Sequence, residues 1–204
     1  MLFRSEWLIP VTVVSLLVIA NGLFVAAEFA IVGASRAHIE HEAGRGNRLA
    51  RRVAGILRDP ARQDRYIATT QVGISVASLG LGMYGEHVLA DWIASQLEPV
   101  DTGDWIAAHT LASIAAVSIL TYLHIVIGEM VPKALALQRA ASTVLYVSPF
   151  ILALQSALLP IVVGLNAAGN RLLGLMGVER SASDTERYHT TEELQYIVEE
   201  SQVG

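Results

Sequence analysis

The sequence predicts an all-α membrane protein with three transmembrane helices. Hydrophobic residues make up 53% of the 204 residues and charged residues only 16%, a composition unlike that of a soluble domain. Three uncharged runs of 21, 20 and 24 residues are each long enough to cross a bilayer core as a helix of about 20 residues. These runs predict transmembrane spans at about 7–31, 66–96 and 104–133.

The remaining composition excludes several classes of protein and of site. The formal net charge is -5, and no basic stripe with interleaved aromatic residues occurs, so we expect no nucleic-acid surface. The chain has no cysteine, which excludes disulfides, zinc–thiolate sites and thiol nucleophiles. Any bound metal must therefore be held by oxygen atoms or imidazole. Sequence motifs of nucleotide binding and of serine hydrolases are also absent, so we expect no enzyme.

The arginines predict the orientation of the chain in the membrane. Eight of the 14 basic residues lie in the connector between the first and second spans: Arg36, Arg45, Arg48, Arg51, Arg52, Arg58, Arg62 and Arg65. Because cytoplasmic loops carry an excess of Lys and Arg, this connector should be cytoplasmic and the N-terminus outside. We expect a multi-pass protein of the plasma membrane whose C-terminus lies in the cytoplasm.

An amphipathic helix is predicted within this connector. Leu49, Val53, Ile56 and Leu57 recur at helical spacing, with arginines on the opposite face. Such a basic helix packs on the helix bundle or lies on anionic lipid. A simple solvated arginine face is an equally good interpretation.

A fourth uncharged run, residues 140–170, is interrupted by Pro149 and Pro160. Each proline removes a helical hydrogen-bond donor, so we expect two or three short juxtamembrane helices at about 141–177 rather than a fourth span. These helices would lie along the inner leaflet. The distribution of basic residues does not decide whether this run crosses the membrane.

The last residues predict a separate segment. Residues 1–178 are expected to form the transmembrane domain. Beyond it, Thr190–Glu193 has the pattern of a capping box that opens a helix. We interpret residues 179–204 as the start of a linker to a following cytoplasmic domain.

An ionisable residue in the third span marks a candidate cation site. Glu129 follows the third uncharged run in the sequence Gly128-Glu129-Met130-Val131-Pro132-Lys133. Pro132 cannot donate to the carbonyl of Gly128 and its ring crowds that turn, so the helix should be broken or kinked beside Glu129. Freed carbonyl oxygens and a carboxylate together predict a site for a cation. The alternative is that Glu129 only forms an ion pair with Lys133, one turn later.

The second span offers neutral oxygen ligands. It is rich in small and hydroxyl-bearing residues, which include Gly73, Ser75 and Ser78. One interpretation of these residues is close helix packing. The other is that Gly73 loosens the helix and exposes a carbonyl, while Ser75 or Ser78 binds the cation. Both interpretations can hold together.

The first span adds Asn21 and Glu28, which lie seven residues apart and hence on one helix face. Asn21 offers its amide oxygen to a cation or forms a hydrogen bond to another helix. Glu28 is either the partner of an arginine such as Arg36 or a second carboxylate on the ion path. His109 and His124 are not at the spacing of a metal-binding pair, so we interpret them as separate core or interfacial residues.

Three sequence blocks stand out together. They are Leu23-Phe-Val-Ala-Ala-Glu28-Phe-Ala, Gly44-Arg-Gly-Asn47-Arg-Leu-Ala-Arg-Arg52 and Ile127-Gly-Glu129-Met-Val-Pro132-Lys133-Ala. These blocks resemble the transmembrane domain of the CNNM/CorC family of magnesium-transport proteins. The last block, with its G-E-x-x-P-K pattern, is the most specific, and the resemblance covers nearly the whole chain.

The resemblance implies a homodimer surrounded by membrane lipid, with three spans per protomer, cytoplasmic helices and a belt of juxtamembrane helices. Residue by residue, Glu129 matches the family's acidic ligand. Gly73, Ser75 and Ser78 fall in the family's second-span polar block, and Asn21 falls where relatives often carry serine. The C-terminal tail resembles the lead-in to a CBS-pair domain.

The resemblance also implies magnesium binding in an inward-facing cavity and export of that ion. We expect export across the plasma membrane by alternating access around Glu129, coupled to sodium or to the membrane potential. Mg2+ suits such a site because it prefers six oxygen ligands at about 2.0–2.1 Å and dehydrates reluctantly. One carboxylate cancels only half of its charge, so we expect Glu28 as a second carboxylate or retained water molecules. The alternative function is a magnesium-binding regulatory or sensor module without transport activity.

Overall fold

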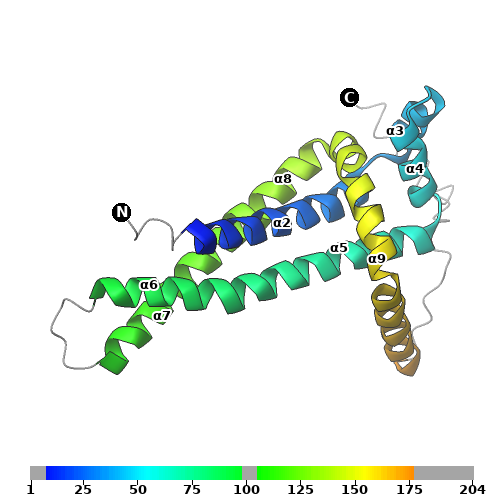
Figure 1. Ribbon diagram of the computed structural model, residues 1–204. Helices are drawn as coiled ribbons and strands as arrows, with labels where there is room; N and C mark the ends of the chain where they lie inside the picture. Colours follow the sequence, from blue (N-terminus) through cyan, green and yellow to red (C-terminus); the bar gives the residue numbers. More distant parts are fainter. Residues whose placement is uncertain (1–7, 98–104, 177–204) are drawn as a thin grey trace, which may run out of the picture. The chain divides into compact units, whose positions relative to one another are not determined.

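The protein consists almost entirely of helices. The structure is a computed structural model that describes residues 8–97 and 105–176, with side chains at 8–93 and 110–176. No strand occurs among these described residues, which confirms the prediction of an all-α fold (Figure 1). The predicted linker at 179–204 lies outside the described residues.

The helix α2 (Leu8–Gly33) is the central element of the bundle. Its 26 residues span about 39 Å, enough to cross a bilayer core. It packs against α5 (Pro60–Gly80) on one side and against the π-helical segment η2 (His124–Met130) and α8 (Val131–Gln138) on the other (Figure 1). The residues that α2 buries are small or apolar, with Asn21 as the polar exception.

Two short helices, α3 (Arg36–Gly44) and α4 (Arg48–Leu57), form the arginine-rich connector, and each begins at a side-chain cap. Ser35 Oγ caps α3, and Asn47 Oδ1 caps α4 by accepting hydrogen bonds from two backbone amides. Gly46, in the turn between them, has a φ of 95°, a left-handed conformation that glycine adopts without strain. The local sequence therefore determines this helical hairpin.

The apolar face of α4 packs into the main core. Val53 and Ile56 are buried together with Tyr66 of α5 and Ile151 of α9 (Ala140–Leu175). Full burial of apolar side chains of this size contributes roughly 1.5–3 kcal/mol each. Of the interpretations of this amphipathic helix, packing on the bundle is thus the one that the structure shows.

The second predicted span is a continuous helix with a π-helical segment inside it. α5 begins at Pro60, directly after the capping residue Asp59. It continues as the π-helical segment η1 (Leu81–Gly85) and as α6 (Glu86–Leu97). The expected loosening of this helix therefore lies at η1 and not at Gly73, where the helix is regular.

The third predicted span is irregular at the position that the proline indicates. α7 (Trp105–Leu123) passes into η2, and α8 starts at Val131 with Pro132 in its first turn. Because α8 follows η2 directly, Pro132 lies inside a continuous helical stretch and withholds one backbone donor from it. The irregularity expected beside Glu129 takes the form of a π-helical segment of seven residues, and the helix continues through it without a break.

The fourth apolar run forms one long helix, α9, and the prediction of two or three short helices is wrong. Pro149 and Pro160 both lie inside this helix. Each proline removes a single hydrogen bond, and the bonds of the turns on either side keep the helix continuous, as in many apolar helices. Residues up to Val163 belong to one compact unit and those from Gly164 to another. Every contact discussed below lies within the first unit.

Three of the described helical stretches can cross a membrane by their length and composition: Leu8–Gly33, Thr110–Gln138 and Ala140–Leu175. The number of candidate membrane-spanning helices agrees with the prediction of three spans, but the helices are not the same three. The helix that covers the second predicted span, 66–96, is not among them, whereas α9 is. The many hydroxyl, amide and glycine residues of α5 lower its hydropathy, while α9 contains a long uncharged run.

Candidate cation site

Asn21 forms a buried contact between two distant segments of the chain. Its side chain is 2% exposed, and its Nδ2 donates a hydrogen bond of 2.9 Å to the backbone carbonyl of Gly128 in η2. In a regular α-helix this carbonyl would accept from the residue four positions later, which is Pro132 and has no N–H. The Asn21 amide therefore supplies this carbonyl with a hydrogen bond that Pro132 cannot give.

The opposite side of the Asn21 amide contacts α5. Ser78 Oγ donates to Asn21 Oδ1 over 3.2 Å and also lies 3.2 Å from His124 Nε2. Because the hydroxyl has a single proton, the imidazole completes this chain when it carries its own proton on Nε2. Asn21, Ser78, His124 and the carbonyl of Gly128 are called the polar cluster below.

Glycines allow the helices to approach closely enough for these contacts. A Cβ atom at Gly128 would lie 3.0 Å from His124 Cδ2 and 3.3 Å from Asn21 Nδ2. A Cβ atom at Gly22 would lie 2.9 Å from Pro132 Cγ. These distances are shorter than ordinary van der Waals contacts, so larger residues at either position would separate α2 from η2 and α8.

A cavity of about 160 Å³ opens beside the polar cluster. Ser78 and His124 line it together with Thr121 of α7 and Glu86, the first residue of α6. At about 30 Å³ per water molecule, this volume accommodates several waters or a hydrated cation. A cation in this cavity would contact hydroxyl, imidazole and carboxylate groups.

Glu129 is adjacent to the polar cluster in sequence, but its side chain is exposed. Among the described residues its carboxylate has no ion pair and no hydrogen bond. Lys133, one turn later, places its Nζ 4.4 Å from the centroid of the Phe29 ring. The alternative of an ion pair between Glu129 and Lys133 is therefore not what this part of the chain shows, and the carboxylate is available to a cation.

Glu28 lies away from the polar cluster, about 10 Å along α2 from Asn21. Its Oε1 accepts a hydrogen bond of 3.3 Å from Gln71 Nε2 of α5. Arg36, the arginine considered as its partner, pairs with Glu40 at 3.3 Å. The structure thus joins Glu28 to a neutral amide, in the direction of the arginine-rich connector.

Of the three second-span residues predicted as ligands, all of them described, only Ser78 reaches the polar cluster. Gly73 packs against Phe24 of α2, and a Cβ atom there would lie 2.5 Å from Phe24 Cε1. Close helix packing is therefore its role in this structure. Ser75 is exposed on α5, three residues and nearly one turn before Ser78.

Sequence reasoning missed His124. We expected a separate core or interfacial residue, yet the structure brings its imidazole to Ser78, 46 positions earlier in the chain. The position of His124 in the sequence could have indicated that it belongs to the polar cluster. His124 lies four residues before Gly128 and eight before Pro132, so it shares their helix face. The side chain of His109 lies outside the described residues.

The polar cluster offers amide, hydroxyl and carbonyl oxygens and one imidazole. The described part of the chain holds no group of three or more His, Cys, Asp or Glu side chains that could bind a metal ion. Neutral oxygen donors suit a hard cation that keeps part of its water shell, and they suit a transition metal poorly. The carboxylates of Glu86, in the cavity wall, and Glu129 are the nearby sources of negative charge.

Irregular helices that surround neutral polar groups inside an apolar bundle are typical of ion-transporting membrane domains. The fold and the site together define a membrane domain of this class. The chain belongs to the CNNM family, because the family's Cyclin M transmembrane N-terminal domain matches residues 12–204. This family is linked to divalent-cation transport and is not a family of enzymes.

Curated bacterial proteins are similar to this chain over most of its length. UPF0053 protein YhdT of Bacillus subtilis (strain 168) is 32% identical over 191 residues, which cover 92% of this chain and 40% of YhdT. UPF0053 protein YrkA of the same organism is 32% identical over 199 residues, 95% of this chain and 43% of YrkA. A UPF0053 protein of Synechocystis sp., sll0260, is 28% identical over 200 residues, 98% of this chain and 43% of that protein. The chain thus spans about two fifths of the length of these relatives.

Proposed function

We propose that this domain exports Mg2+ across the plasma membrane by alternating access around the polar cluster and Glu129. The observation that supports this proposal is the hydrogen bond from Asn21 to the Gly128 carbonyl, at a π-helical segment that also carries Glu129. This bond places a neutral oxygen donor set beside a residue whose neighbour in the sequence is Glu129, and among the described residues the exposed Glu129 carboxylate has no ion pair. A charged residue in such a place costs about 2.5–3.5 kcal/mol on insertion scales, a cost that binding of a cation would offset.

The proposed ligands divide into two groups along the ion path. Asn21 Oδ1, Ser78 Oγ and the Glu129 carboxylate bind the ion at membrane depth, with water molecules completing the six-coordinate shell. Glu28 and Ser75 lie nearer the arginine-rich connector and line the inward path, where Glu28 attracts the cation, while Gly73 keeps α5 packed against α2. At the cluster, Glu129 supplies one negative charge and the ion keeps part of its water shell, because Glu28 lies about 10 Å away along α2.

The π-helical segments provide the mobility that alternating access requires. π-Helical turns occur frequently at functional sites. η1 and η2 lie on the two helices that flank the polar cluster. We assign them the role of joints that open the site to one side of the membrane at a time.

The orientation and the assembly complete the proposal. The arginines of α3 and α4 favour a cytoplasmic location for this end of the bundle, with the N-terminus outside and the C-terminus inside. We propose a homodimer embedded in membrane lipid. Sodium, moving in the opposite direction, is the proposed coupling ion.

The proposal is tested by Mg2+ flux through the protein reconstituted in liposomes that contain a magnesium-sensitive dye. Loss of a group that contacts only a metal ligand lowers metal affinity or activity by about 10–100-fold. Glu129 is proposed to bind the ion directly, so Glu129→Gln should lower the Mg2+ flux by more than this. Glu40→Gln removes an equal charge from α3, outside the apolar bundle, and should leave the flux unchanged. Unchanged flux in Glu129→Gln would refute the proposal. Mg2+ binding without flux in the wild type would instead support a regulatory or sensor module.

A further inference from the structure

A second cavity, of about 330 Å³, lies where α4, the start of α5 and α9 meet. Three arginines contribute to its lining, which consists of Arg52, Ile56, Arg62, Arg65, Leu152 and Gln155. No carboxylate belongs to this lining. The cavity is separate from the polar cluster, with which it shares no residue.

Helical spacing explains how three elements build this cavity. Arg52 and Ile56 lie four residues apart on α4, so one face of this helix presents a guanidinium beside an apolar side chain. Arg62 and Arg65 lie three residues apart in the first turns of α5. Leu152 and Gln155, also three residues apart, come from α9 (Ala140–Leu175). Each element therefore contributes two neighbouring side chains from one face.

The cavity concentrates positive charge. Asp59 Oδ2 lies 3.1 Å from Arg62 Nε and is the N-cap of α5, so it partly neutralises one guanidinium. Three cations lining one cavity repel each other unless an anion lies between them. Guanidinium groups match the geometry of phosphate oxygens, to which they donate pairs of parallel hydrogen bonds.

The surroundings of the cavity favour a lipid over a soluble anion. Arg65 is the last charged residue before twenty uncharged residues, so the apolar part of this helix begins immediately beyond it. Ile56 and Leu152 add apolar surface to the lining. Leu152 also lies on α9, a helix that is long and apolar enough to cross a membrane. A ligand with a phosphate and an apolar tail fits both parts of this environment.

We propose that this cavity binds the phosphate of an anionic phospholipid headgroup from the leaflet that faces the arginine-rich connector. Arg52, Arg62 and Arg65 hold the phosphate oxygens, and Gln155 donates to the headgroup. The acyl chains follow the apolar surface of α9 into the bilayer. This lipid fastens α4 to α9 at the end of the bundle, and the proposal does not depend on Mg2+ export.

Native mass spectrometry of the purified protein in detergent tests the proposal, with phosphatidylglycerol as the probe. Arg52→Gln/Arg65→Gln removes two of the guanidinium groups and leaves the pair between Arg62 and Asp59 intact. Glutamine and arginine have similar helix propensities, so the fold should be preserved. At about 1 kcal/mol per basic residue, the double variant should bind phosphatidylglycerol about thirtyfold more weakly.

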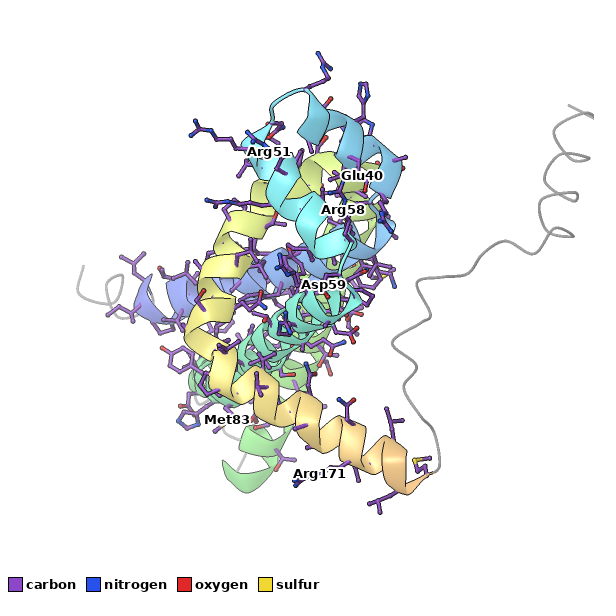
Figure 2. All side chains as sticks on the ribbon, turned by 90° about the vertical axis from the view of Figure 1, so that its right-hand side faces the viewer. Glu40, Arg51, Arg58, Asp59, Met83 and Arg171 are labelled. Carbon is purple, nitrogen blue, oxygen red and sulfur yellow. The ribbon has the colours of Figure 1, made fainter. Side chains whose placement is uncertain are left out.

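Arg48→Gln/Arg51→Gln is the matched control, because it removes the same charge from α4 outside the cavity. Both residues are exposed, and Arg51 is labelled in Figure 2 at the same end of the bundle as Arg58 and Asp59. Phosphatidylglycerol binding should change by less than about twofold in this variant, in line with a weak and non-specific surface contribution. Equal losses in the two double variants would overturn the proposal and indicate general electrostatic attraction.

Two further arms distinguish the source of the phosphate. Phosphatidylcholine, whose phosphate charge is offset by its choline group, should bind more weakly than phosphatidylglycerol and should lose less affinity in Arg52→Gln/Arg65→Gln. Inorganic phosphate should displace phosphatidylglycerol only at much higher concentration than the lipid itself. Equal binding of both lipids, or displacement by inorganic phosphate at concentrations equal to that of the lipid, would overturn the assignment of an anionic lipid.

Discussion

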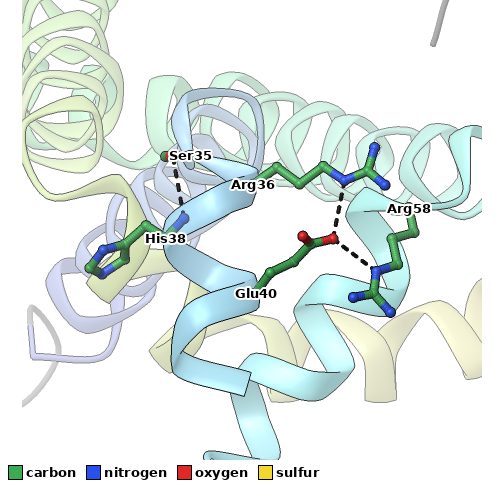
Figure 3. A network of polar contacts seen from close by, with 5 residues as sticks. All are labelled: Ser35, Arg36, His38, Glu40 and Arg58. Carbon is green, nitrogen blue, oxygen red and sulfur yellow. Dashed lines mark hydrogen bonds and ion pairs between the residues drawn. The ribbon is translucent and has the colours of Figure 1, made fainter. Parts of the chain in front are cut away.

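Glu40 and Glu129 show how differently two regions of this molecule treat a carboxylate. Glu40, in the arginine-rich connector, accepts from Arg58 Nε at 2.9 Å and from Arg36 Nε at 3.3 Å (Figure 3). Glu129, beside the polar cluster, has no ion pair within the described part of the chain. Arginines of the connector balance the charge of Glu40. The charge of Glu129 remains available to a bound cation.

The two regions also differ in how the chain assembles them. In the connector, each helix begins at a cap formed by the residue before it, and ion pairs join neighbours on exposed surfaces. In the polar cluster, side chains from three elements meet, and no carboxylate, lysine or arginine of the described chain takes part in the hydrogen bonds of Asn21 and Ser78. Charged pairs therefore occur at the end rich in arginine, and neutral oxygen donors occur within the apolar bundle, where a bound cation would supply the missing charge.

Substitution of Asn21 should give the largest effect on stability and is the strongest test of this comparison. Asn21→Leu keeps the approximate size of the side chain but removes the amide donor from the Gly128 carbonyl, to which Pro132 cannot donate. A buried acceptor without a partner costs roughly 1–3 kcal/mol, so the free energy of unfolding should fall by about this amount. Chemical unfolding in detergent, followed by helical circular dichroism, measures it.

Ser118→Ala is the control for this variant. The Ser118 hydroxyl is exposed and donates to the Ile114 carbonyl of its own helix, so its loss should change the stability by less than about 0.5 kcal/mol. If Asn21→Leu were as stable as Ser118→Ala, the contact between Asn21 and Gly128 would carry no structural weight. The difference drawn between the two regions would then be wrong.

Gly73→Ala should have the next largest effect, because it forces apart the helices that bring Asn21 to Ser78. A Cβ atom at this position would lie within 2.5–2.7 Å of three ring atoms of Phe24. Insertion of a methyl group into such a packed contact costs about 1–3 kcal/mol, measurable by the same unfolding experiment. Gly164→Ala, for which no atom lies within 4 Å of the added Cβ, should be neutral or stabilising.

A double-mutant cycle identifies the origin of this loss. Phe24→Leu removes part of the ring that meets the new methyl group, so Gly73→Ala should cost less in that background than in the wild type. Additive losses would show that Gly73 acts through something other than the Phe24 contact. A loss of Mg2+ binding that exceeds the loss of stability would restore the interpretation of Gly73 as a ligand.

Much of the fold follows from signals that are local in the sequence. Uncharged runs predict the apolar helices, and the spacing of Val53 and Ile56 predicts the buried face of α4. Pro132 alone predicts that the helix is irregular beside Glu129, because the absence of its N–H affects a carbonyl only four residues earlier. Local prolines can also mislead, since α9 continues through both of its prolines.

The contacts of the candidate site could not be predicted in the same way. Asn21 and Gly128 are 107 positions apart, and Ser78 is 57 positions from Asn21. Which side chains meet depends on the rotation of each helix about its axis, and one residue corresponds to about 100° of rotation. The sequence therefore identified Asn21 and Ser78 as candidate site residues. It did not indicate that His124 belongs to the polar cluster or that Ser75 lies outside it.

The smallest expected effect concerns the connector and depends on pH. Hydrogen bonds from Arg58 and then from Arg36 lower the pKa of Glu40 below its ordinary value of 4.5. A lowered pKa in the folded state stabilises the protein above the ordinary pKa, and this contribution is lost as the pH falls through the lowered value. Wild type should therefore have a slightly higher melting temperature than Glu40→Gln near neutral pH, and the two melting temperatures should converge as the solution is acidified below pH 4.5.

The difference in melting temperature between wild type and Asn21→Leu should persist over the same pH range, because Asn21 has no titratable group. A difference for Glu40→Gln that persists as well would mean that its ion pairs contribute nothing to stability, as is common for exposed pairs.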